Sequence, residues 1–274
     1  MRLLIAVDME GISGVVNWNQ VNPEHAEYQR FRKIMTEDVN AAIRGAAEAG
    51  AKAFVVADGH WDSSNLLIEA LDPRAQLAAG TPAPLSMVQG VQSGVDAALF
   101  IGYHARAGTP NAILDHTWSS TRVANLWLNG RLCGEFGFNA AVCGHFGVPV
   151  LMVSGDQAVC AEAREWVPEV ETVQVKQAVG RWAAECLPLA EAHARIQEGA
   201  QRAVRRFREG QGPRPLRLET PLRVQVEFLA TQMADGAMLL PGAERVDGRT
   251  IAFTAPDALS AYRSFRAAVA LAVR

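Results

Sequence analysis

Short apolar runs alternate with longer stretches of helical periodicity along most of the chain. An apolar run at residues 3–7 predicts a first strand, and residues 26–49 carry apolar side chains at steps of three and four, which predicts a helix. The alternation continues with predicted strands at 53–58, 76–80, 96–104, 151–156 and 170–175 and predicted helices at 63–71 and 157–166. Continuous apolar strands separated by helices are typical of a mostly parallel sheet covered on both faces. We therefore predict an α/β fold with such a sheet flanked by helices.

Two regions depart from this alternation. Residues 121–135 have β-type side chains around Asn129 and Gly130, a dipeptide that favours a two-residue hairpin. Later segments predict a helix at 189–207, a linker at 209–221, a strand at 223–229, a helix at 230–239, a strand at 250–255 and a final helix at 257–273. We therefore predict an α/β domain at 1–210 and a small α+β domain at 211–274.

The composition narrows the class of protein without naming a function. The chain has 274 residues, of which 49 % are hydrophobic and 20 % charged, and a formal charge of −3, which is typical of a globular protein. The densest basic segment, 202–217, is interpreted as a solvated helix end running into a linker, so we expect no nucleic-acid partner. No apolar run approaches the ~20 residues of a membrane span, so we expect no membrane partner. Without a secretory signal and with four cysteines that form no C-x-x-C pair, a cytoplasmic location is predicted.

Residues that can bind metal follow the three best predicted strands. Asp8 and Glu10 follow the first strand, Asp58 and His60 follow the second, and His104 follows the strand that begins at residue 96. In an extended chain, residues two apart point to the same face, so each pair can converge. Because ligands of open α/β sheets bind beyond the carboxyl ends of the strands, we expect these side chains to meet at one edge of the sheet.

A metal site competes with a simpler interpretation, because acidic residues and glycine are ordinary turn formers at strand ends. Two of the six histidines at such ends, beside carboxylates, favour the metal site. Imidazole together with carboxylate suits a borderline divalent ion, zinc before others. The number of oxygen ligands could also hold two ions, roughly 3.5–4 Å apart. Hydrolysis of an amide, an ester or a phosphate is the reaction class that this chemistry predicts.

Seven motifs in this order resemble those of the zinc-dependent D-aminopeptidases of the dipeptide-permease-operon type. They are AVDMEGISG, VADGHWDSSNL, PLSMVQG, FIGYHARAGTP, LDHTW, GEFGFNA and VPVLMVSGD, and the segment LLPG at 239–242 also matches. The resemblance covers nearly the whole chain, and the combination of spaced motifs is far more specific than VDMEG alone.

The resemblance implies a set of site residues. The implied zinc ligands are Asp8, Glu10, His60, His104 and Glu135. Asp8 matches the residue that bridges two zinc ions, so two ions per subunit are expected. His116 matches the catalytic histidine, although the family pattern has serine before it and this chain has Asp115. That difference could change the orientation or the basicity of His116.

The resemblance also implies an activity and an assembly. The expected reaction is removal of the N-terminal residue from short peptides or amides, D-alanine especially, by a zinc-activated water that attacks the carbonyl. Family members form rings that enclose their active sites, so a homo-oligomer is expected, with a decamer as the implied size. Small peptides are the expected substrate partners.

The residues alone leave several roles open. Glu135 at a helix start is commonly only favourable dipole placement, and His116 lies in a loop where histidines are usually exposed. Arg106 could bind a substrate carboxylate or form a surface ion pair. Asn139 could bind substrate or only form a hydrogen bond at the start of a helix. Trp61 and Trp118 could line the substrate pocket or serve packing, while His25, His145 and His193 are interpreted as structural.

Two rival functions are also consistent with some of these features. A phosphoryl-transfer hydrolase would use Asp8 as nucleophile with magnesium, but it gives His60 and His104 no role. A non-catalytic assembly protein would hold a structural metal, with a coordination sphere closed by protein ligands and no adjacent cleft.

Overall fold

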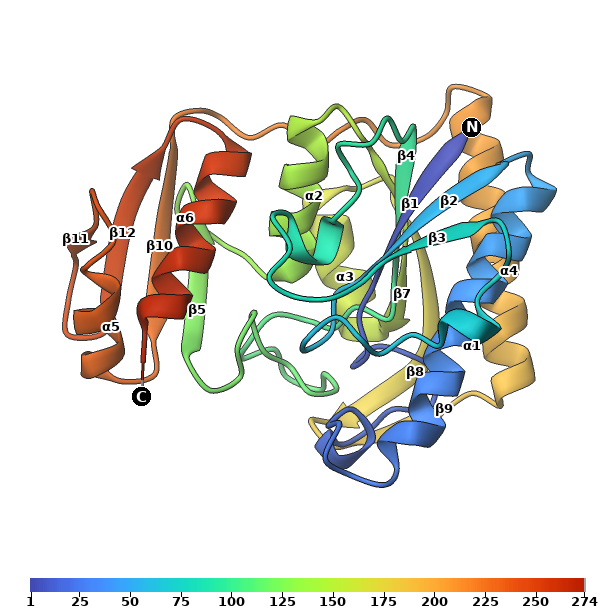
Figure 1. Cartoon of the computed structure of the whole chain (residues 1–274), viewed down its shortest axis with the longest axis horizontal. Coiled ribbons are helices and arrows are strands. Elements are labelled where there is room, and N and C mark those ends of the chain that lie inside the picture. Colours follow the sequence, from blue (N-terminus) through green and yellow to red (C-terminus); the bar gives the residue numbers. More distant parts are fainter. Residues whose placement is uncertain (274) are drawn as a thin grey trace.

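The larger sheet of the protein has seven strands in the order β3-β2-β1-β4-β7-β8-β9 in the computed structural model, which describes residues 1–273 (Figure 1). Its strands are β1 (Arg2–Val7), β2 (Ala53–Asp58), β3 (Ala75–Ala78), β4 (Ala97–Ile101), β7 (Val150–Asp156), β8 (Glu171–Gly180) and β9 (Ala183–Cys186). All neighbours are parallel except β8 and β9. From β1 the chain adds β2 and β3 on one side and then β4, β7 and β8 on the other, so the strand order reverses between β1 and β4.

Both faces of this sheet are buried, as its continuous apolar strands predict. Leu3, Ile5 and Val7 pack in one core with α1 (Tyr28–Glu48) and α4 (Leu189–Arg208). Leu4 and Ala6 face the opposite core, which includes α2 (Glu135–His145) and α3 (Gln157–Trp166) (Figure 1). This alternation holds β1 in place on both sides and positions its carboxyl end.

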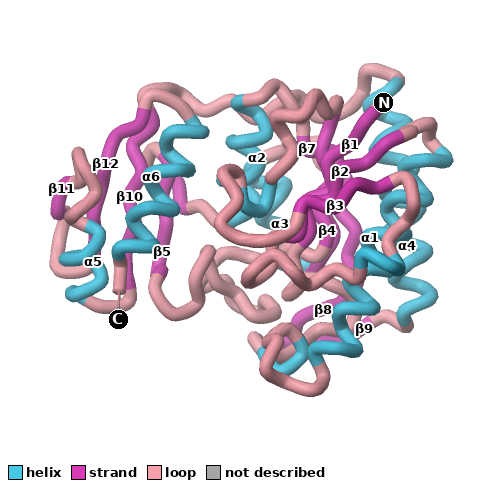
Figure 2. The backbone as a smooth tube through the Cα atoms, viewed as in Figure 1, coloured by secondary structure: helices cyan, strands magenta, loops and turns pink. Residues whose placement is uncertain are grey.

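The smaller sheet is antiparallel and has the order β11-β12-β10-β5-β6 (Figure 2). Its strands are β5 (Val123–Leu128), β6 (Arg131–Leu132), β10 (Leu222–Phe228), β11 (Glu244–Arg245) and β12 (Thr250–Ala255). The β5–β6 hairpin turns at Asn129 and Gly130, whose φ angles of 50° and 77° match the left-handed turn predicted from this dipeptide. Helices α5 (Thr231–Ala237) and α6 (Ala258–Leu271) pack on this sheet, and α6 also contacts α2.

The predicted α/β fold with a mostly parallel sheet is confirmed. The boundary predicted at residue 210 stays a prediction, and the smaller sheet takes β5 and β6 from before that residue. Apart from the longer elements, the chain forms single turns of 3-10 helix at η1 (Trp18–Gln20), η2 (Ile68–Ala70) and η3 (Ser86–Val88). Among residues 1–273, no helix has the length and apolar character needed to cross a membrane.

The helix predicted at 63–71 is wrong, because only the single turn η2 forms there. The buried carboxylate of Asp58 accepts the backbone N–H groups of Asn65 and Leu66 at 2.7 and 2.8 Å. The hydroxyl of Thr36 accepts the next N–H, that of Leu67, at 3.1 Å. Side chains from distant elements therefore take the N–H groups that an α-helix would bond internally.

Candidate metal centre

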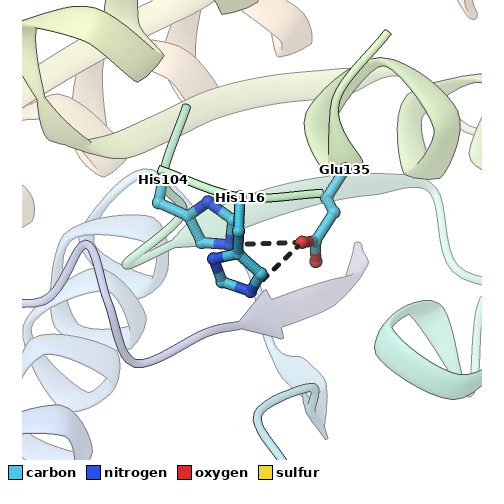
Figure 3. Close-up of side chains that lie close together, drawn as sticks. All are labelled: His104, His116 and Glu135. Carbon is cyan, nitrogen blue, oxygen red and sulfur yellow. Dashed lines mark ion pairs between the residues drawn. The ribbon is translucent and has the colours of Figure 1, made fainter. Parts of the chain in front are cut away.

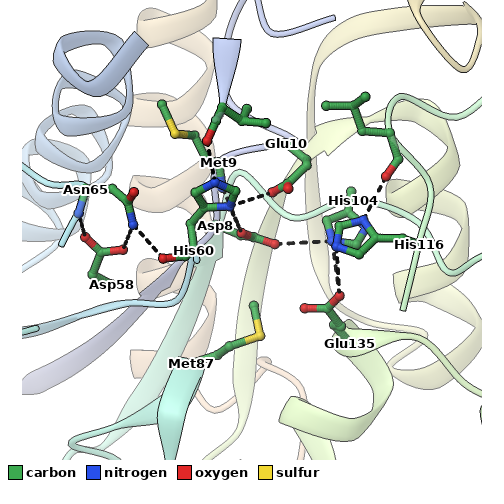
Figure 4. Close-up of polar contacts among 12 residues, drawn as sticks. Asp8, Met9, Glu10, Asp58, His60, Asn65, Met87, His104, His116 and Glu135 are labelled. Carbon is green, nitrogen blue, oxygen red and sulfur yellow. Dashed lines mark hydrogen bonds and ion pairs between the residues drawn. The ribbon is translucent and has the colours of Figure 1, made fainter. Parts of the chain in front are cut away.

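The predicted site residues meet at the carboxyl ends of β1, β2 and β4, where the strand order of the larger sheet reverses (Figure 4). Asp8 and Glu10 follow β1, His60 follows β2, and His104 follows β4. All four residues are buried, with at most 5 % of each exposed. Four ionisable groups therefore share a site that is largely shielded from water.

Two glycines let the ends of β1 and β4 approach backbone to backbone. A Cβ atom on Gly11 would lie 1.9 Å from the carbonyl oxygen of Tyr103, so no other residue fits there without a shift. Gly102 has a φ of 70°, and a Cβ atom there would lie 2.4 Å from the carbonyl oxygen of Asp8. This close approach places the segment of Asp8 directly beside the segment of His104.

Asp8 lies between two histidines from different strands. Its Oδ1 is 3.3 Å from Nδ1 of His60, and its Oδ2 is 3.3 Å from Nε2 of His104. Nδ1 of His60 also lies 3.1 Å from Oε2 of Glu10. Each carboxylate oxygen of Asp8 thus faces a different imidazole.

Glu135 and His116 complete the cluster from outside the strand ends (Figure 3). Oε1 of Glu135, the first residue of α2, lies 3.2 Å from Nε2 of His104 and 3.8 Å from Nε2 of His116. The same oxygen accepts the backbone N–H of Trp118 at 2.7 Å, which holds the carboxylate in place. The rings of His104 and His116 stack with their centroids 4.0 Å apart and 13° between their planes.

Backbone carbonyls set the tautomers of the three histidines. His60 Nε2 donates to Val21 O at 2.8 Å, His104 Nδ1 to Ala105 O at 3.0 Å, and His116 Nδ1 to Leu114 O at 2.8 Å. Because a carbonyl oxygen only accepts, each of these nitrogens carries the proton. In the neutral ring the other nitrogen then directs a lone pair at the carboxylates, as in metal sites whose histidines are oriented by hydrogen bonds on the far side.

This arrangement calls for a cation. Lone pairs on imidazole nitrogens and carboxylate oxygens repel at these distances unless positive charge lies between them. Oε2 of Glu10 and Nε2 of His104 are buried and have no hydrogen-bond partner within residues 1–273. Two groups of three ligand atoms, each within 4.8 Å of one another, share His104. The first group is Asp8, Glu10 and His104, and the second is His104, His116 and Glu135. The donor set of imidazole and carboxylate fits zinc.

The pKa values of the cluster respond to the same charges. Burial alone would raise the pKa of Asp8, but the adjacent imidazoles of His104 and His60 lower it well below its ordinary value. Burial would lower the pKa values of His60 and His104, but the neighbouring carboxylates raise both well above the ordinary value. His60 and His104 therefore attract a cation, whether a proton or a metal ion.

His116 differs from the other two histidines. Burial and the positive charge of His104 lower the pKa of His116, and the attraction of Glu135 only partly offsets them. Its ring is therefore neutral at pH 7, and Nε2 is free to accept a proton. The edge of Trp18 packs against this ring at a centroid distance of 5.6 Å.

A cavity of about 560 Å³ opens beside the cluster. Its lining includes Asp8, Glu10, His60, His116 and Glu135 together with Trp18, Trp61 and Trp118. Because the cluster lines this cavity, it is only partly enclosed by protein, and a small molecule in the cavity could reach it. An open position beside the ligands is the feature that separates catalytic from structural zinc sites.

The comparisons with known proteins match the chain over its whole length. The D-aminopeptidase family model matches residues 1–267. The D-aminopeptidase of Bacillus subtilis strain 168 is 38 % identical over 275 residues, which is 100 % of this chain and 98 % of that protein. The chain belongs to the D-aminopeptidase family. Among solved structures, the chain is similar to the zinc-dependent D-aminopeptidase DppA of Bacillus subtilis, which is described as a self-compartmentalizing protease. The two superpose with a TM-score of 0.95 at 38 % sequence identity, and the match covers 100 % of this chain and 98 % of that one.

Two predicted substrate-binding residues of this D-aminopeptidase family member lie away from the cavity. The guanidinium of Arg106 pairs with Glu165 at 3.1 Å and with Glu162 at 3.6 Å. The amide of Asn139 is buried and donates to the hydroxyl of Tyr103 at 3.0 Å. Neither residue is part of the lining described above, and their roles in substrate binding stay predictions.

Asp115, which replaces the usual serine of the family pattern, does not contact the ring of His116. Its Oδ2 accepts the backbone N–H of Gly108 at 2.7 Å, and its Oδ1 pairs with Nε of Arg181 at 2.8 Å. The charge of Asp115 is therefore balanced by Arg181, and the residue fixes the loop that carries His116.

Lys176 on β8 supports the site, and nothing in the sequence pattern points to it. Its ammonium is fully buried and donates to the carbonyl oxygens of Glu10, Ile12 and Val15 at 2.7, 3.0 and 2.8 Å. Burial lowers the pKa of Lys176 to about 8, so the ammonium is retained at neutral pH. One side chain from a distant strand thus binds three carbonyls of this loop, of which that of Ile12 also accepts the N–H of Val15, and this fixes the loop of Glu10.

Backbone strain is concentrated around the cluster. Trp61, Leu114 and Trp118 have positive φ angles of 51°, 51° and 65°, a region that side chains rarely adopt. Trp61 adjoins His60, and the other two flank His116 within two residues. Strain of this kind persists where surrounding contacts hold it, commonly at functional sites.

Proposed function

We propose that this protein is a zinc-dependent aminopeptidase that removes the N-terminal residue, D-alanine above all, from short peptides or amides. The observation that carries the proposal is the convergence of five carboxylate and imidazole side chains on one buried cluster that opens into a cavity. Family membership and the zinc dependence of the Bacillus subtilis relative support the same function.

The residues proposed to hold zinc are Asp8, Glu10, His60, His104 and Glu135. Two ions per subunit are proposed because the two oxygens of Asp8 face histidines from different strands. Zinc, when bound, polarises a carbonyl and lowers the pKa of water to about 7.

The protein side chains would orient the substrate and move a proton. The carboxylates of the cluster attract the positively charged amino terminus of a peptide, which places the first peptide bond beside His116. Since His116 is neutral, lines the cavity and has its Nε2 3.8 Å from Oε1 of Glu135, it is proposed to accept a proton from the attacking water. The same nitrogen would return the proton to the amine that leaves when the C–N bond breaks.

The two rival functions have less support. A phosphoryl-transfer nucleophile would need a free carboxylate oxygen, whereas both oxygens of Asp8 face imidazole nitrogens at 3.3 Å. A structural metal in an assembly protein would be enclosed by ligands, whereas this cluster borders a cavity of about 560 Å³.

Replacement of His116 by Ala tests the catalytic assignment. We expect the variant to keep its zinc, because the five proposed ligands remain, and to lose roughly 10²–10⁴-fold in kcat, the usual contribution of a general acid–base residue. Metal analysis and turnover of D-alanine amide should be measured on the same sample. Near-full turnover would show that His116 is not the proton-transfer residue.

Parallel assays on D-alanine and L-alanine amides, with a chelator control, test the reaction itself. Selective hydrolysis of the D-enantiomer that stops with the chelator is the expected result. Equal rates on both enantiomers would contradict the stereospecificity, and an unchanged rate with chelator would contradict the metal.

A ring-shaped homo-oligomer is also proposed, because the related Bacillus subtilis enzyme is described as self-compartmentalizing. A decamer is the size that we expect, and measurement of the particle mass in solution would test it. The predicted cytoplasmic location stays a prediction.

A further inference from the structure

A second cavity of about 320 Å³ adjoins the cavity of the metal cluster. The two share the lining residues Gly59, Trp61, Trp118, Arg122 and Glu135, so they meet along these residues as one continuous space. The far wall of the second cavity comes from α6, through Arg266 and its neighbours in the next turn. A molecule that reaches the cluster can therefore extend toward the smaller sheet.

Two arginines line this second cavity. One guanidinium N–H of Arg122 donates to the carbonyl oxygen of Val269 at 3.0 Å, and one of Arg266 donates to that of Pro84 at 2.7 Å. A guanidinium has five N–H donors, so most donors of both groups are left for other partners. Within residues 1–273, neither arginine forms an ion pair with a carboxylate, whereas Arg106 and Arg181, near the same site, each do.

The arginines are held where a ligand could use them. Both are half-buried, and the guanidinium of Arg266 lies 5.9 Å from the ring centroid of Trp118 and 5.7 Å from that of Tyr262. Aromatic faces attract a guanidinium and limit its rotamers, which reduces the entropy lost on binding an anion. The backbone bonds to Val269 and Pro84 have the same effect.

The charges of the continuous space are thus opposite at its two ends. Carboxylates gather at the metal cluster, Arg122 and Glu135 line both cavities, and Arg266 lines only the second. A short peptide has the complementary distribution, with an ammonium at one end and a carboxylate at the other. Planar guanidinium groups bind carboxylates through paired charge-assisted hydrogen bonds.

We propose that Arg122 and Arg266 bind the C-terminal carboxylate of a short peptide whose N-terminal residue lies at the metal cluster. This inference rests on the proposed aminopeptidase function and narrows its substrate class to short peptides with a free carboxyl end. Peptides whose C-terminus is amidated, or lies too far along the chain to reach the arginines, lose this interaction.

The test compares free-acid and C-terminally amidated forms of D-alanyl-glycine and D-alanyl-glycyl-glycine on the zinc-loaded enzyme. At one of these lengths at least, kcat/KM for the acid should exceed that for the amide by about tenfold to hundredfold, the range for hydrogen bonds to a charged group. In Arg266→Gln, and in Arg122→Gln, this ratio should fall toward 1. Arg266→Lys keeps the charge but not the paired geometry and should give an intermediate ratio.

Arg263→Gln is the matched control, because Arg263 is exposed one turn earlier on α6. It should leave the acid-to-amide ratio unchanged. If Arg122→Gln fails to fold, Arg266→Gln and Arg266→Lys provide the test, because Arg266 is only half-buried on α6. An acid-to-amide ratio near 1 at both lengths in the unaltered enzyme, or a ratio that survives Arg266→Gln, would overturn the proposal.

Failure of the proposed function gives a different result. If none of these compounds is hydrolysed, the aminopeptidase assignment fails, and the arginine site is then tested by calorimetric binding of D-alanyl-glycine and its amide. Binding of the acid that is tighter than that of the amide, and that is lost in Arg266→Gln, supports the carboxylate site on its own. Equal binding of both compounds contradicts it.

Discussion

The two sheets of this protein contribute to the same site in different ways. The larger, parallel sheet is buried on both faces, and four of the five proposed ligands follow its strands. The smaller, antiparallel sheet supplies none of these four, but its helix α6 forms the far wall of the second cavity, and Arg122, just before β5, lines both cavities. Glu135 lies where the chain leaves β6 and enters α2, between the two sheets.

This difference has a physical cause. Buried strands with fixed ends can hold several desolvated carboxylates and imidazoles in a precise arrangement, because their backbones cannot relax away from one another. The antiparallel sheet and α6 are more exposed and can carry guanidinium groups that remain partly hydrated. Chemistry is therefore expected to depend on the larger sheet and substrate selection on the smaller one.

Asp8→Asn should have the largest effect, because Asp8 faces histidines from two strands. We expect the zinc content to fall and kcat to drop by at least about a thousandfold, comparable to the loss of a major electrostatic stabiliser. Metal analysis and hydrolysis of D-alanine amide measure both effects. Asp62→Asn, an exposed carboxylate near the cavity, is the control and should retain both. Full zinc content in Asp8→Asn would show that Asp8 is not a ligand.

Phe265→Ala should separate stability from metal binding. Phe265 of α6 is 1 % exposed and packs against Trp118 and Phe138, so its loss should lower the free energy of unfolding by about 3–5 kcal/mol. The folded fraction should still bind zinc, because the ligands belong mainly to the larger sheet. Denaturant unfolding and metal analysis at low temperature test this, with Arg263→Ala as a surface control. Loss of zinc from the folded variant would show that the two regions cannot be separated.

Lys176→Met should weaken the site from the side of the larger sheet. It leaves the carbonyls of Glu10, Ile12 and Val15 without their buried donor, which should lower the free energy of unfolding by about 3 kcal/mol. Zinc affinity should fall about 10–100-fold, as for other residues that orient ligands. Zinc titration and denaturant unfolding measure these effects, and the exposed Lys33→Met should change neither. Unchanged zinc affinity would show that the loop is held by other contacts.

Glu162→Gln should give the smallest effect, a change in pH dependence. Burial raises the pKa of Glu162 from 4.5 to about 7 in the folded protein. Between these values the folded protein holds a proton that the unfolded chain has released. The contribution of protonated Glu162 to the free energy of unfolding is thus fully present below pH about 4.5 and is lost as pH rises through 7. A shift of this size corresponds to about 3 kcal/mol in total, of which roughly 2 kcal/mol is lost between pH 5 and pH 8.

Unfolding free energies at pH 5 and pH 8 test this prediction. The difference between the two should be smaller in Glu162→Gln than in the unaltered protein. Glu165→Gln, an exposed partner of the same arginine, should keep the original difference. An identical pH dependence in both variants would show that Glu162 titrates normally.

Much of the fold could be predicted from local patterns. The strands β1, β2 and β4, the helix α1 and the hairpin at Asn129 and Gly130 depend on periodicity and turn chemistry within a few residues. The helix predicted at 63–71 does not form, because the buried carboxylate of Asp58 accepts the N–H groups of Asn65 and Leu66. Local periodicity carries no information on such long-range partners. Strand β9 was also missed, because its residues 183–186 are mostly exposed and lack a buried pattern.

The candidate site divides in the same manner. Asp8, Glu10, His60 and His104 could be inferred from strand ends, whereas Glu135 and His116 depended on resemblance to a family. Neither approach indicated the carbonyls that set the histidine tautomers, the buried Lys176, or the arginines of the second cavity. These partners are far from the ligands in the sequence and have no motif of their own.

The sequence by itself determined the alternation of strands and helices and the types of ligand that follow the strands, because both depend on neighbouring residues. Only the tertiary structure decided which lone pair each histidine presents, which side chains satisfy the loop of Glu10, and where unpaired arginines lie relative to the cluster. These features depend on contacts between segments up to 182 residues apart, which form only when the two sheets and their helices pack together.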